Sequence, residues 1–267
     1  MKSEFMKGKR GLIMGVANDH SIAWGIAQSL ADAGAEIAFT YQGDAFGKRL
    51  EPLAQSLGSN LIMPCDVEDI ASVDAVFEQL KAKWGKIDFL VHSIGFSDKN
   101  ELKGKYADTS RANFSRTMVI SAFSFVEVTK RAAALMPDGG SIITLTYGGS
   151  TRVMPNYNVM GVAKAALEAS VRYLAADYGP QGIRVNAISA GPMRTLAGAG
   201  IGDARAMFKF QETHSPLRRA VALEEVGGAG LYLLSALSGG VTGEVHYVDA
   251  GYNIISMPRT EDLNKQS

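Results

Sequence analysis

Short apolar runs alternate with helix-length amphipathic stretches along almost the whole chain, and this rhythm limits the possible folds more than any other feature of the sequence. The apolar runs have the length of buried strands. The stretches between them repeat apolar residues with a helical period, as Val73, Val76, Phe77 and Leu80 do. Strands that alternate with helices indicate βαβ units, which build a parallel sheet covered by helices on both faces.

The sequence therefore predicts an α/β protein with a Rossmann-like, doubly wound, seven-stranded parallel sheet. Strands are expected at 11–16, 36–41, 60–65, 87–94, 141–146, 183–188 and 244–248. Helices are expected at 21–33, 44–57, 70–84, within 114–136, at 156–178 and at 223–237. Since no linker or repeat interrupts the pattern, we expect one dinucleotide-binding domain over 1–267. Peripheral tails are expected at 1–6 and about 256–267, and a glycine-containing lid over substrate and cofactor at 195–210.

Composition narrows the class of protein. Hydrophobic residues make up 46% and charged residues 20%, enough for a full core. The 27 basic and 27 acidic residues cancel, which argues against nucleic-acid and membrane binding. One cysteine, Cys65, allows no internal disulfide, and the sequence shows neither a signal peptide nor a membrane span, so we expect a cytoplasmic location. The four histidines do not cluster in the sequence, and no metal site is expected.

A dinucleotide site is expected where the first strand meets the first helix. Gly15 permits a close backbone approach to a pyrophosphate, and Ser21 and Ile22 begin a helix whose free N–H groups attract anions. The spacing from Gly15 to Gly25 is not the usual glycine-rich pattern. An ordinary turn with a serine cap therefore stays open at this point.

The ends of the next strands suggest which dinucleotide binds. Gln42 can hydrogen-bond ribose hydroxyls, Asp44 would repel a 2′-phosphate, and the first basic residues, Lys48 and Arg49, lie inside the next helix, so NADH is favoured over NADPH. Two further pairs of residues are candidates for cofactor contact, with a helix cap as the alternative for Asp66. They are Asp66 with Val67 after the third strand, and Ile94 with Gly95 closing the fourth.

Tyr157 and Lys164 are the candidate catalytic residues. They are seven residues apart, which is two helical turns, so they share one helix face. Both are expected to face the carboxyl ends of the strands, as is Tyr147 at the end of the fifth strand. A neighbouring ammonium eases deprotonation of a phenol, and such a pair can stabilise a developing oxyanion. The alternative is a core tyrosine and a surface lysine.

The order of elements, together with the segment 186–192 after the sixth strand, resembles the short-chain dehydrogenases/reductases. Most of these carry Tyr-x-x-x-Lys, but Met160 stands four residues before Lys164 here. The spacing from Tyr157 to Lys164, the second tyrosine Tyr147 and the long 15–25 loop resemble instead the bacterial enoyl-[acyl-carrier-protein] reductases. The similarity extends along nearly the whole chain.

The resemblance implies NADH-dependent reduction of the trans-2 double bond of enoyl thioesters in fatty acid synthesis. Tyr157 would stabilise the enolate, Lys164 would bind the nicotinamide ribose, and Tyr147 would orient the substrate or assist its protonation. The implied cofactor contacts are Gly15, Ser21, Ile22, Gln42, Asp66, Val67, Ile94, Lys164, Met193, Arg194, Thr195, Leu196 and Ala197. The implied substrate contacts are Gly95, Phe96, Ser97, Tyr147, Tyr157, Met160, Ile201 and Phe208, with Met154 and Met207 as further candidates for an apolar slot.

Partners follow from the same resemblance. An acidic acyl carrier protein would deliver the substrate, and Arg194, Arg205 and Lys209 could receive it. A homotetramer is implied, with 163–174 and 245–255 as candidate contacts between copies.

Two other functions remain open at this point. A 3-ketoacyl-thioester reductase of the same fold would prefer Tyr at position 160 and Ser near positions 144–147, whereas this chain has Met160 and Tyr147. A non-catalytic dinucleotide-binding module would have no use for Tyr157 and Lys164.

Overall fold

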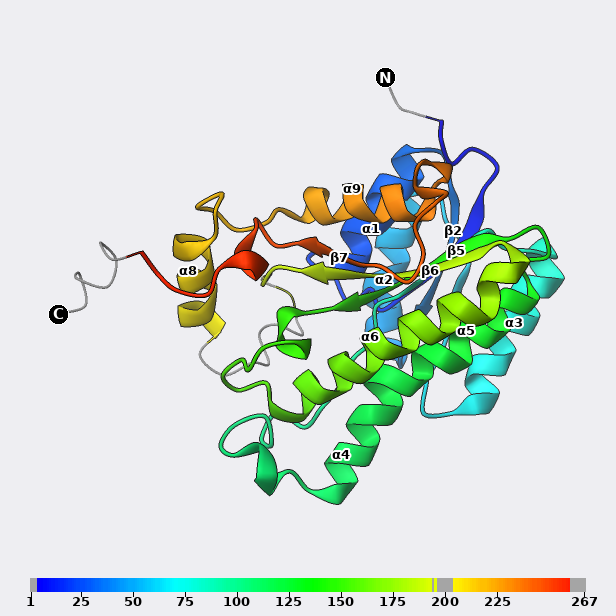
Figure 1. Cartoon of the computed structure of the whole chain (residues 1–267). Helices are drawn as coiled ribbons and strands as arrows, with labels where there is room; N and C mark the ends of the chain where they lie inside the picture. The colour runs from blue at the N-terminus through cyan, green and yellow to red at the C-terminus, as the bar shows by residue number, and fades with distance from the viewer. Residues whose placement is uncertain (1–3, 194, 196–203, 260–267) are drawn as a thin grey trace.

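Seven parallel strands form one sheet in the order β3-β2-β1-β4-β5-β6-β7 (Figure 1). The computed structural model describes residues 4–193, 195 and 204–259. The strands are β1 Arg10–Met14, β2 Glu36–Tyr41, β3 Ile62–Pro64, β4 Phe89–His92, β5 Gly140–Thr146, β6 Ile183–Ala190 and β7 Val245–Val248. Because β1 lies between β2 and β4, the winding reverses there, which makes the carboxyl end of β1 the switch point where ligands bind in such sheets. The predicted doubly wound fold is confirmed.

Helices cover both faces of the sheet (Figure 1). One face carries α1 Ile22–Asp32, α2 Asp44–Ser56 and α9 Leu223–Leu234. The other carries α3 Ile70–Trp84, α4 Arg111–Met118, α5 Ser124–Ala134 and α6 Asn158–Tyr178. The remaining helix, α8 Ala204–His214, lies beyond the carboxyl ends of the strands and was not predicted as a helix. Short helical turns occur at Tyr106–Asp108, Gly148–Ser150, Gly179–Gln181, Ala236–Ser238 and Tyr252–Ile254.

Alternate side chains of each strand point to opposite faces of the sheet and pack into two separate hydrophobic cores. In β1, Leu12 and Met14 pack with α3, α5 and α6, whereas Ile13 packs with α1 and α9. All three are fully buried. Burial on both faces explains why the strands are continuous apolar runs rather than alternating ones.

The helix expected within 114–136 is interrupted. Between α4 and α5 runs a π-helical turn, Val119–Phe123, and such turns are frequent at functional sites. Within it, the Ser121 hydroxyl accepts a hydrogen bond from the Phe96 amide (2.9 Å) and donates one to the Phe96 carbonyl (3.0 Å). The turn therefore holds the loop that follows β4.

The expectation of a peripheral segment over 1–6 is wrong at Met6. Its side chain is 2% exposed, and its amide donates a 2.9 Å hydrogen bond to the Ala33 carbonyl. Met6 thus completes the core beneath α1, whereas Glu4 and Phe5 are exposed. None of the described helices combines the length and the apolar character that crossing a bilayer requires.

Helices α1 and α9 pack closely because glycine lies at their contact. A Cβ atom at Gly227 would lie 2.4 Å from Ser29 Oγ and 2.5 Å from the Gly25 carbonyl oxygen. Neither distance is sterically possible without moving a helix. At the adjacent Gly228, an added Cβ would meet no atom within 4 Å.

We predict that Gly227→Ala destabilises the protein by about 1–3 kcal/mol, because the helices must separate. The matched control is Gly228→Ala on the same helix, which should be neutral or stabilising by up to about 1 kcal/mol, as alanine favours helix. Urea unfolding of both variants measures the difference. Equal stability of the two variants would contradict the packing argument.

Candidate active site

Lys164 lies at the carboxyl edge of the sheet, as predicted. Its Nζ donates a 2.7 Å hydrogen bond to the carbonyl of Leu145 near the end of β5. A Cβ atom built on Gly95, just past β4, would lie 3.8 Å from the same Nζ. The ammonium group is therefore close to the ends of two neighbouring strands, where a parallel sheet of this kind receives its ligand.

Tyr157 immediately precedes α6 and lies beside Tyr147, the residue that follows β5. The two rings meet edge to face, with centroids 5.3 Å apart. Glycine at 149 makes room for this arrangement, since a Cβ there would lie 2.4 Å from the Tyr157 ring. The structure thus brings the two tyrosines together at one end of α6, from which Lys164 also projects.

Burial acts in opposite directions on the phenol and the ammonium. The Tyr157 side chain is 7% exposed, and this burial raises its pKa, as do the nearby Tyr147 and Glu168. Burial lowers the pKa of Lys164 to about 8, and Glu168 opposes that change. The expected lowering of the Tyr157 pKa by Lys164 is not what the structure gives, since burial, Tyr147 and Glu168 raise that pKa. Tyr157 is therefore a neutral phenol that is able to donate a hydrogen bond.

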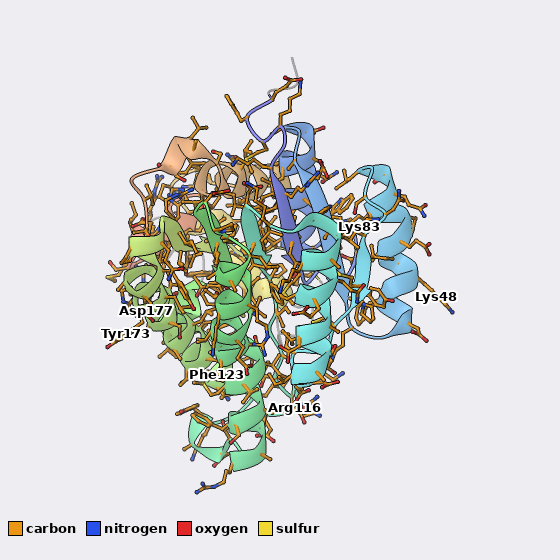
Figure 2. All side chains as sticks on the ribbon, turned by 90° about the vertical axis from the view of Figure 1, so that its right-hand side faces the viewer. Lys48, Lys83, Arg116, Phe123, Tyr173 and Asp177 are labelled. Carbon is orange, nitrogen blue, oxygen red and sulfur yellow. The ribbon has the colours of Figure 1, made fainter. Side chains whose placement is uncertain are left out.

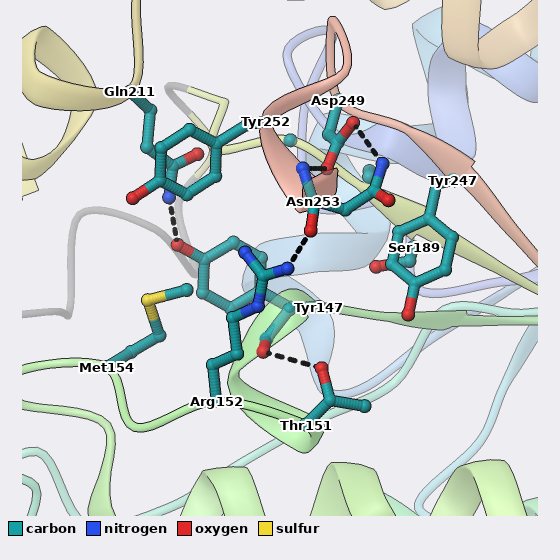
Figure 3. A pocket seen from close by; sticks show the side chains of 13 residues that line it. Tyr147, Thr151, Arg152, Met154, Ser189, Gln211, Tyr247, Asp249, Tyr252 and Asn253 are labelled. Carbon is teal, nitrogen blue, oxygen red and sulfur yellow. Dashed lines mark hydrogen bonds between the residues drawn. The ribbon is translucent and has the colours of Figure 1, made fainter. Parts of the chain in front are cut away.

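Gln211 is a contact of Tyr147 that the sequence did not indicate. Gln211 lies on α8, and its Nε2 donates a 2.8 Å hydrogen bond to the Tyr147 hydroxyl oxygen (Figure 3). Since Tyr147 accepts this bond, its own hydroxyl proton is available for another acceptor. Burial raises the pKa of Tyr147, so this phenol also remains protonated.

A small cavity of about 30 Å³ lies on the side of Tyr147 that faces the segment after β7 (Figure 3). Arg152 spans its rim, donating to the carbonyl oxygens of Asn253 and Ile255. The Asp249 carboxylate accepts hydrogen bonds from the Gly251 and Asn253 amides. These bonds fix the chain behind Tyr147, and the cavity is lined by neither Tyr157 nor Lys164.

His92 also lies near this edge, at the end of β4, and is fully buried. Its Nδ1 is 3.2 Å from Thr144 Oγ1 and its Nε2 is 2.9 Å from Ser124 Oγ. Burial first, and then the charge of Lys164, lowers its pKa to about 3, so the ring is neutral. Its contacts are those of a structural histidine.

The residues expected to bind the pyrophosphate, between β1 and α1, also make contacts within the protein. Gly15 has a φ of +96°, and a Cβ there would lie 1.9 Å from the Ser93 carbonyl oxygen, so packing between β1 and β4 already requires glycine. The Ser21 hydroxyl accepts from the amides of Ala17 (3.0 Å) and Asn18 (3.1 Å) and does not cap α1. The amides of Trp24 and Gly25 donate to the Ser21 carbonyl, which leaves those of Ile22 and Ala23 in the first turn of α1 for an anion.

Gln42 and Asp66 meet at the ends of β2 and β3. Gln42 Nε2 donates a 3.0 Å hydrogen bond to Asp66 Oδ2. The alternative that Asp66 caps the next helix is wrong, because Asp69 precedes α3 and accepts from the Ala71 amide. An amide and a carboxylate at this place fit hydroxyl and amino groups of an adenosine, and the carboxylate disfavours a phosphate.

The residues expected to contact the substrate differ in exposure and in their present contacts. Phe96 is 41% exposed, with the Arg116 guanidinium 4.5 Å from its ring centroid. The Ser97 hydroxyl accepts from Thr117 Oγ1 (2.9 Å) and so already belongs to an internal network. Gly95 is exposed beside Lys164, whereas Met154, Met160, Met193, Met207 and Phe208 are partly buried. Arg194, Leu196, Ala197 and Ile201 lie outside the described residues.

Among the residues the structure describes, no group of three or more His, Cys, Asp or Glu side chains could hold a metal ion. The sheet order and the Tyr157 and Lys164 pair at its carboxyl edge define a Rossmann-like reductase of the short-chain class. Known proteins narrow this class. A sequence profile described as "Enoyl-(Acyl carrier protein) reductase" matches residues 15–253, and the chain belongs to this family.

Relatives of high sequence identity agree with this assignment. The chain is 74% identical to enoyl-[acyl-carrier-protein] reductase [NADH] 2 of Rhizobium meliloti, over 97% of this chain and 96% of that protein. Among solved structures, FabI from Candidatus Liberibacter asiaticus superposes with a TM-score of 0.95 at 61% identity, covering 97% and 100% of the two chains. The enzyme from Anaplasma phagocytophilum, solved in complex with NAD, gives a TM-score of 0.94 at 55% identity, covering 97% and 98%.

Proposed function

We propose that this protein is an NADH-dependent enoyl-[acyl-carrier-protein] reductase that performs the last reductive step of fatty acid elongation. The observation that carries this proposal is the cluster of Lys164, Tyr157 and Tyr147 at the carboxyl edge of β4 and β5. It is supported by 74% identity to a relative with that activity in its name. The ketoacyl reductase is disfavoured, because Met160 stands where that enzyme needs its tyrosine.

The residues present fit a nicotinamide dinucleotide. The open first turn of α1 suits the pyrophosphate, and Gln42 with Asp66 suits an adenosine without a 2′-phosphate. Ile94 and Gly95 after β4, and Met193 and Thr195 after β6, adjoin the nicotinamide end in this assignment. Bound NADH supplies the hydride that reduces the β-carbon of the enoyl thioester.

Tyr157 stabilises the charge that develops on the thioester oxygen. Its phenol is neutral and buried, so it can donate a hydrogen bond to an enolate without first losing a proton to solvent. Lys164 holds the nicotinamide ribose hydroxyls and adds positive charge near that oxygen. Tyr147, whose proton is left free by the bond from Gln211, orients the acyl thioester. The expected lid, 195–210, lies outside the described residues at 196–203, and its described residues 204–210 belong to α8.

The central assay follows oxidation of NADH with crotonyl or acetoacetyl thioester. Turnover is expected with the enoyl compound only. Turnover with only the keto compound supports the ketoacyl reductase, and turnover with neither supports the non-catalytic module.

Tyr157→Phe should lower kcat by about tenfold or more through loss of one oxyanion donor, with little change in KM for NADH. Lys164→Ala should also weaken NADH binding by about tenfold or more, since a charge-assisted hydrogen bond contributes about 1.5–3 kcal/mol. Wild-type activity of Tyr157→Phe would remove its assigned role.

The substrate arrives on acyl carrier protein, in our proposal, and α8 receives it. Arg205 and Lys209 are exposed on one side of α8, with the partly buried Phe208 between them, and together with Glu212 they line a hollow. Basic side chains around an apolar residue suit an acidic carrier that presents an acyl chain.

Lys209→Glu is predicted to raise KM for carrier-bound crotonate by about two- to fivefold, the usual size of one exposed ion pair. The KM for crotonyl-coenzyme A should change less, and added salt should reduce the difference between the wild type and the variant. The matched control is Lys83→Glu on α3, far from α8. A KM for the carrier substrate that neither charge reversal nor salt alters would rule out this docking site.

We further propose that copies of this chain associate through α4, α5 and α6, as a tetramer in the cytoplasm. The expectation for 163–174 needs correction, because Ala163, Leu167 and Val171 are buried against the chain's own sheet. The residues free to meet another copy are Phe114, Val119, Phe123, Val162 and Tyr173, exposed by 38%, 40%, 54%, 37% and 75%. Figure 2 shows Phe123 and Tyr173 on the same side of the molecule. Around 245–255, Tyr247 (38%) and Ile254 (72%) are also exposed.

Phe123→Asp should dissociate the assembly at micromolar concentration, because a charge would replace a buried aromatic contact. Light scattering after size-exclusion chromatography measures the mass. The control is Phe5→Asp, which changes another exposed phenylalanine (60% exposed) outside this patch and should leave the mass unchanged. An unchanged mass for both variants would exclude this interface.

A further inference from the structure

Glu168 is a buried carboxylate beside the site, and the mechanism above gives it no role. It lies on α6 one turn after Lys164, and the residue is 6% exposed. Its Oε1 accepts a 2.6 Å hydrogen bond from Thr146 Oγ1. Thr146 is the last residue of β5 and directly precedes Tyr147, so the carboxylate is fixed to the same strand end as the candidate active site.

A buried charge is costly unless nearby groups compensate for it. One hydroxyl donor is little compensation, which indicates that the field of a cation contributes. Lys164 is a cation at this edge of the sheet, and its charge lowers the pKa of His92 on β4. Burial lowers the pKa of Lys164, and the Glu168 carboxylate opposes that lowering. Among the described residues, His92, Tyr147 and Tyr157 are also titratable groups at this edge, and burial keeps each of them neutral. Asp249 and Tyr252 lie beyond Tyr147 and raise its pKa.

We propose that Glu168 is a positioning residue: held by Thr146, its carboxylate keeps the Lys164 ammonium protonated and in place to bind the ribose of the dinucleotide. This inference rests on the proposed role of Lys164. Two hydrogen bonds fix the arrangement from neighbouring positions of β5, one from Thr146 to Glu168 and one from Lys164 to the Leu145 carbonyl. Strand and helix thereby hold the anion and the cation at a set separation.

The sign of the pH effect follows from the lysine. With a pKa of about 8, Lys164 is charged below that pH and loses its charge as the pH rises through it. Removing the Glu168 charge removes the effect that opposes burial, so the pKa falls further. Dinucleotide binding should then fail at a lower pH than in the wild type.

The test is the affinity for NADH, measured by nicotinamide fluorescence across a pH range of about 6–10, in which a lysine of lowered pKa titrates. The value of kcat/KM for NADH is the second readout. Glu168→Gln keeps the size of the side chain and an acceptor for Thr146. We expect its binding midpoint to move about one unit or more toward acid, giving about tenfold weaker binding above both midpoints and near-equal binding below them. A purely structural role would weaken binding at every pH alike.

Asp177→Asn is the matched control, because it removes an exposed carboxylate from the same helix and should leave the midpoint unchanged. Thr146→Val provides the second test should Glu168→Gln fail to fold: it frees the carboxylate without removing its charge, and its midpoint should move the same way by less. A wild-type midpoint in Glu168→Gln, or in Thr146→Val where only that variant folds, overturns the inference.

Lys164→Met separates this inference from the proposed function. If the wild type shows the midpoint, Lys164→Met abolishes it and Glu168→Gln leaves it unmoved, only the inference about Glu168 fails. If Lys164→Met binds NADH with the wild-type affinity and midpoint, Lys164 does not hold the dinucleotide. The proposed site and the inference then fail together.

Discussion

The hydrogen bond from Lys164 to the Leu145 carbonyl connects α6 with the carboxyl edge of the sheet, and the arrangement of the site depends on it. It brings a helix from one face of the sheet to the strand ends, where the reversal of winding opens a place for a ligand. Tyr157, at the start of the same helix, is then held against Tyr147 at the end of β5. The site is therefore a consequence of how α6 docks, and the docking follows from the buried apolar side of that helix.

Desolvation is the second feature that determines the chemistry of the site. It makes the phenol of Tyr157 harder to ionise and the ammonium of Lys164 easier to neutralise, so the same burial that creates a good hydrogen-bond donor weakens the cation beside it. A carboxylate at Glu168 offsets the second effect but adds to the first. Both outcomes suit a reaction in which a neutral donor meets an enolate while a cation holds the ribose.

The fold could be predicted from the sequence because burial on both faces leaves a strong pattern. β2 and α3 begin and end at the predicted residues, Glu36–Tyr41 and Ile70–Trp84. The π-helical turn at Val119–Phe123 was missed because it changes the hydrogen bonding by one residue and leaves the helical period of apolar residues almost intact. Helix α8 was missed because the glycines before it suggested a loop throughout.

The site was predictable only in part. Tyr157, Lys164 and Tyr147 were found because helical spacing and strand ends place them. Gln211 gave no signal, since its contact with Tyr147 joins residues 64 positions apart through a helix that was not predicted. Glu168 could have been found, because a glutamate four residues after a candidate lysine shares its helix face. The raised pKa of Tyr157 depends on the extent of burial, which sequence spacing does not give.

We expect Lys164 and Tyr157 to adjoin the nicotinamide, and a crystal structure with NAD and an unreactive enoyl thioester analogue tests this most directly. Lys164 Nζ should lie within hydrogen-bond distance of the nicotinamide ribose hydroxyls, and the Tyr157 hydroxyl should point to the thioester oxygen. A dinucleotide bound elsewhere, or bound with both side chains out of reach of its nicotinamide half and of the thioester, would contradict it.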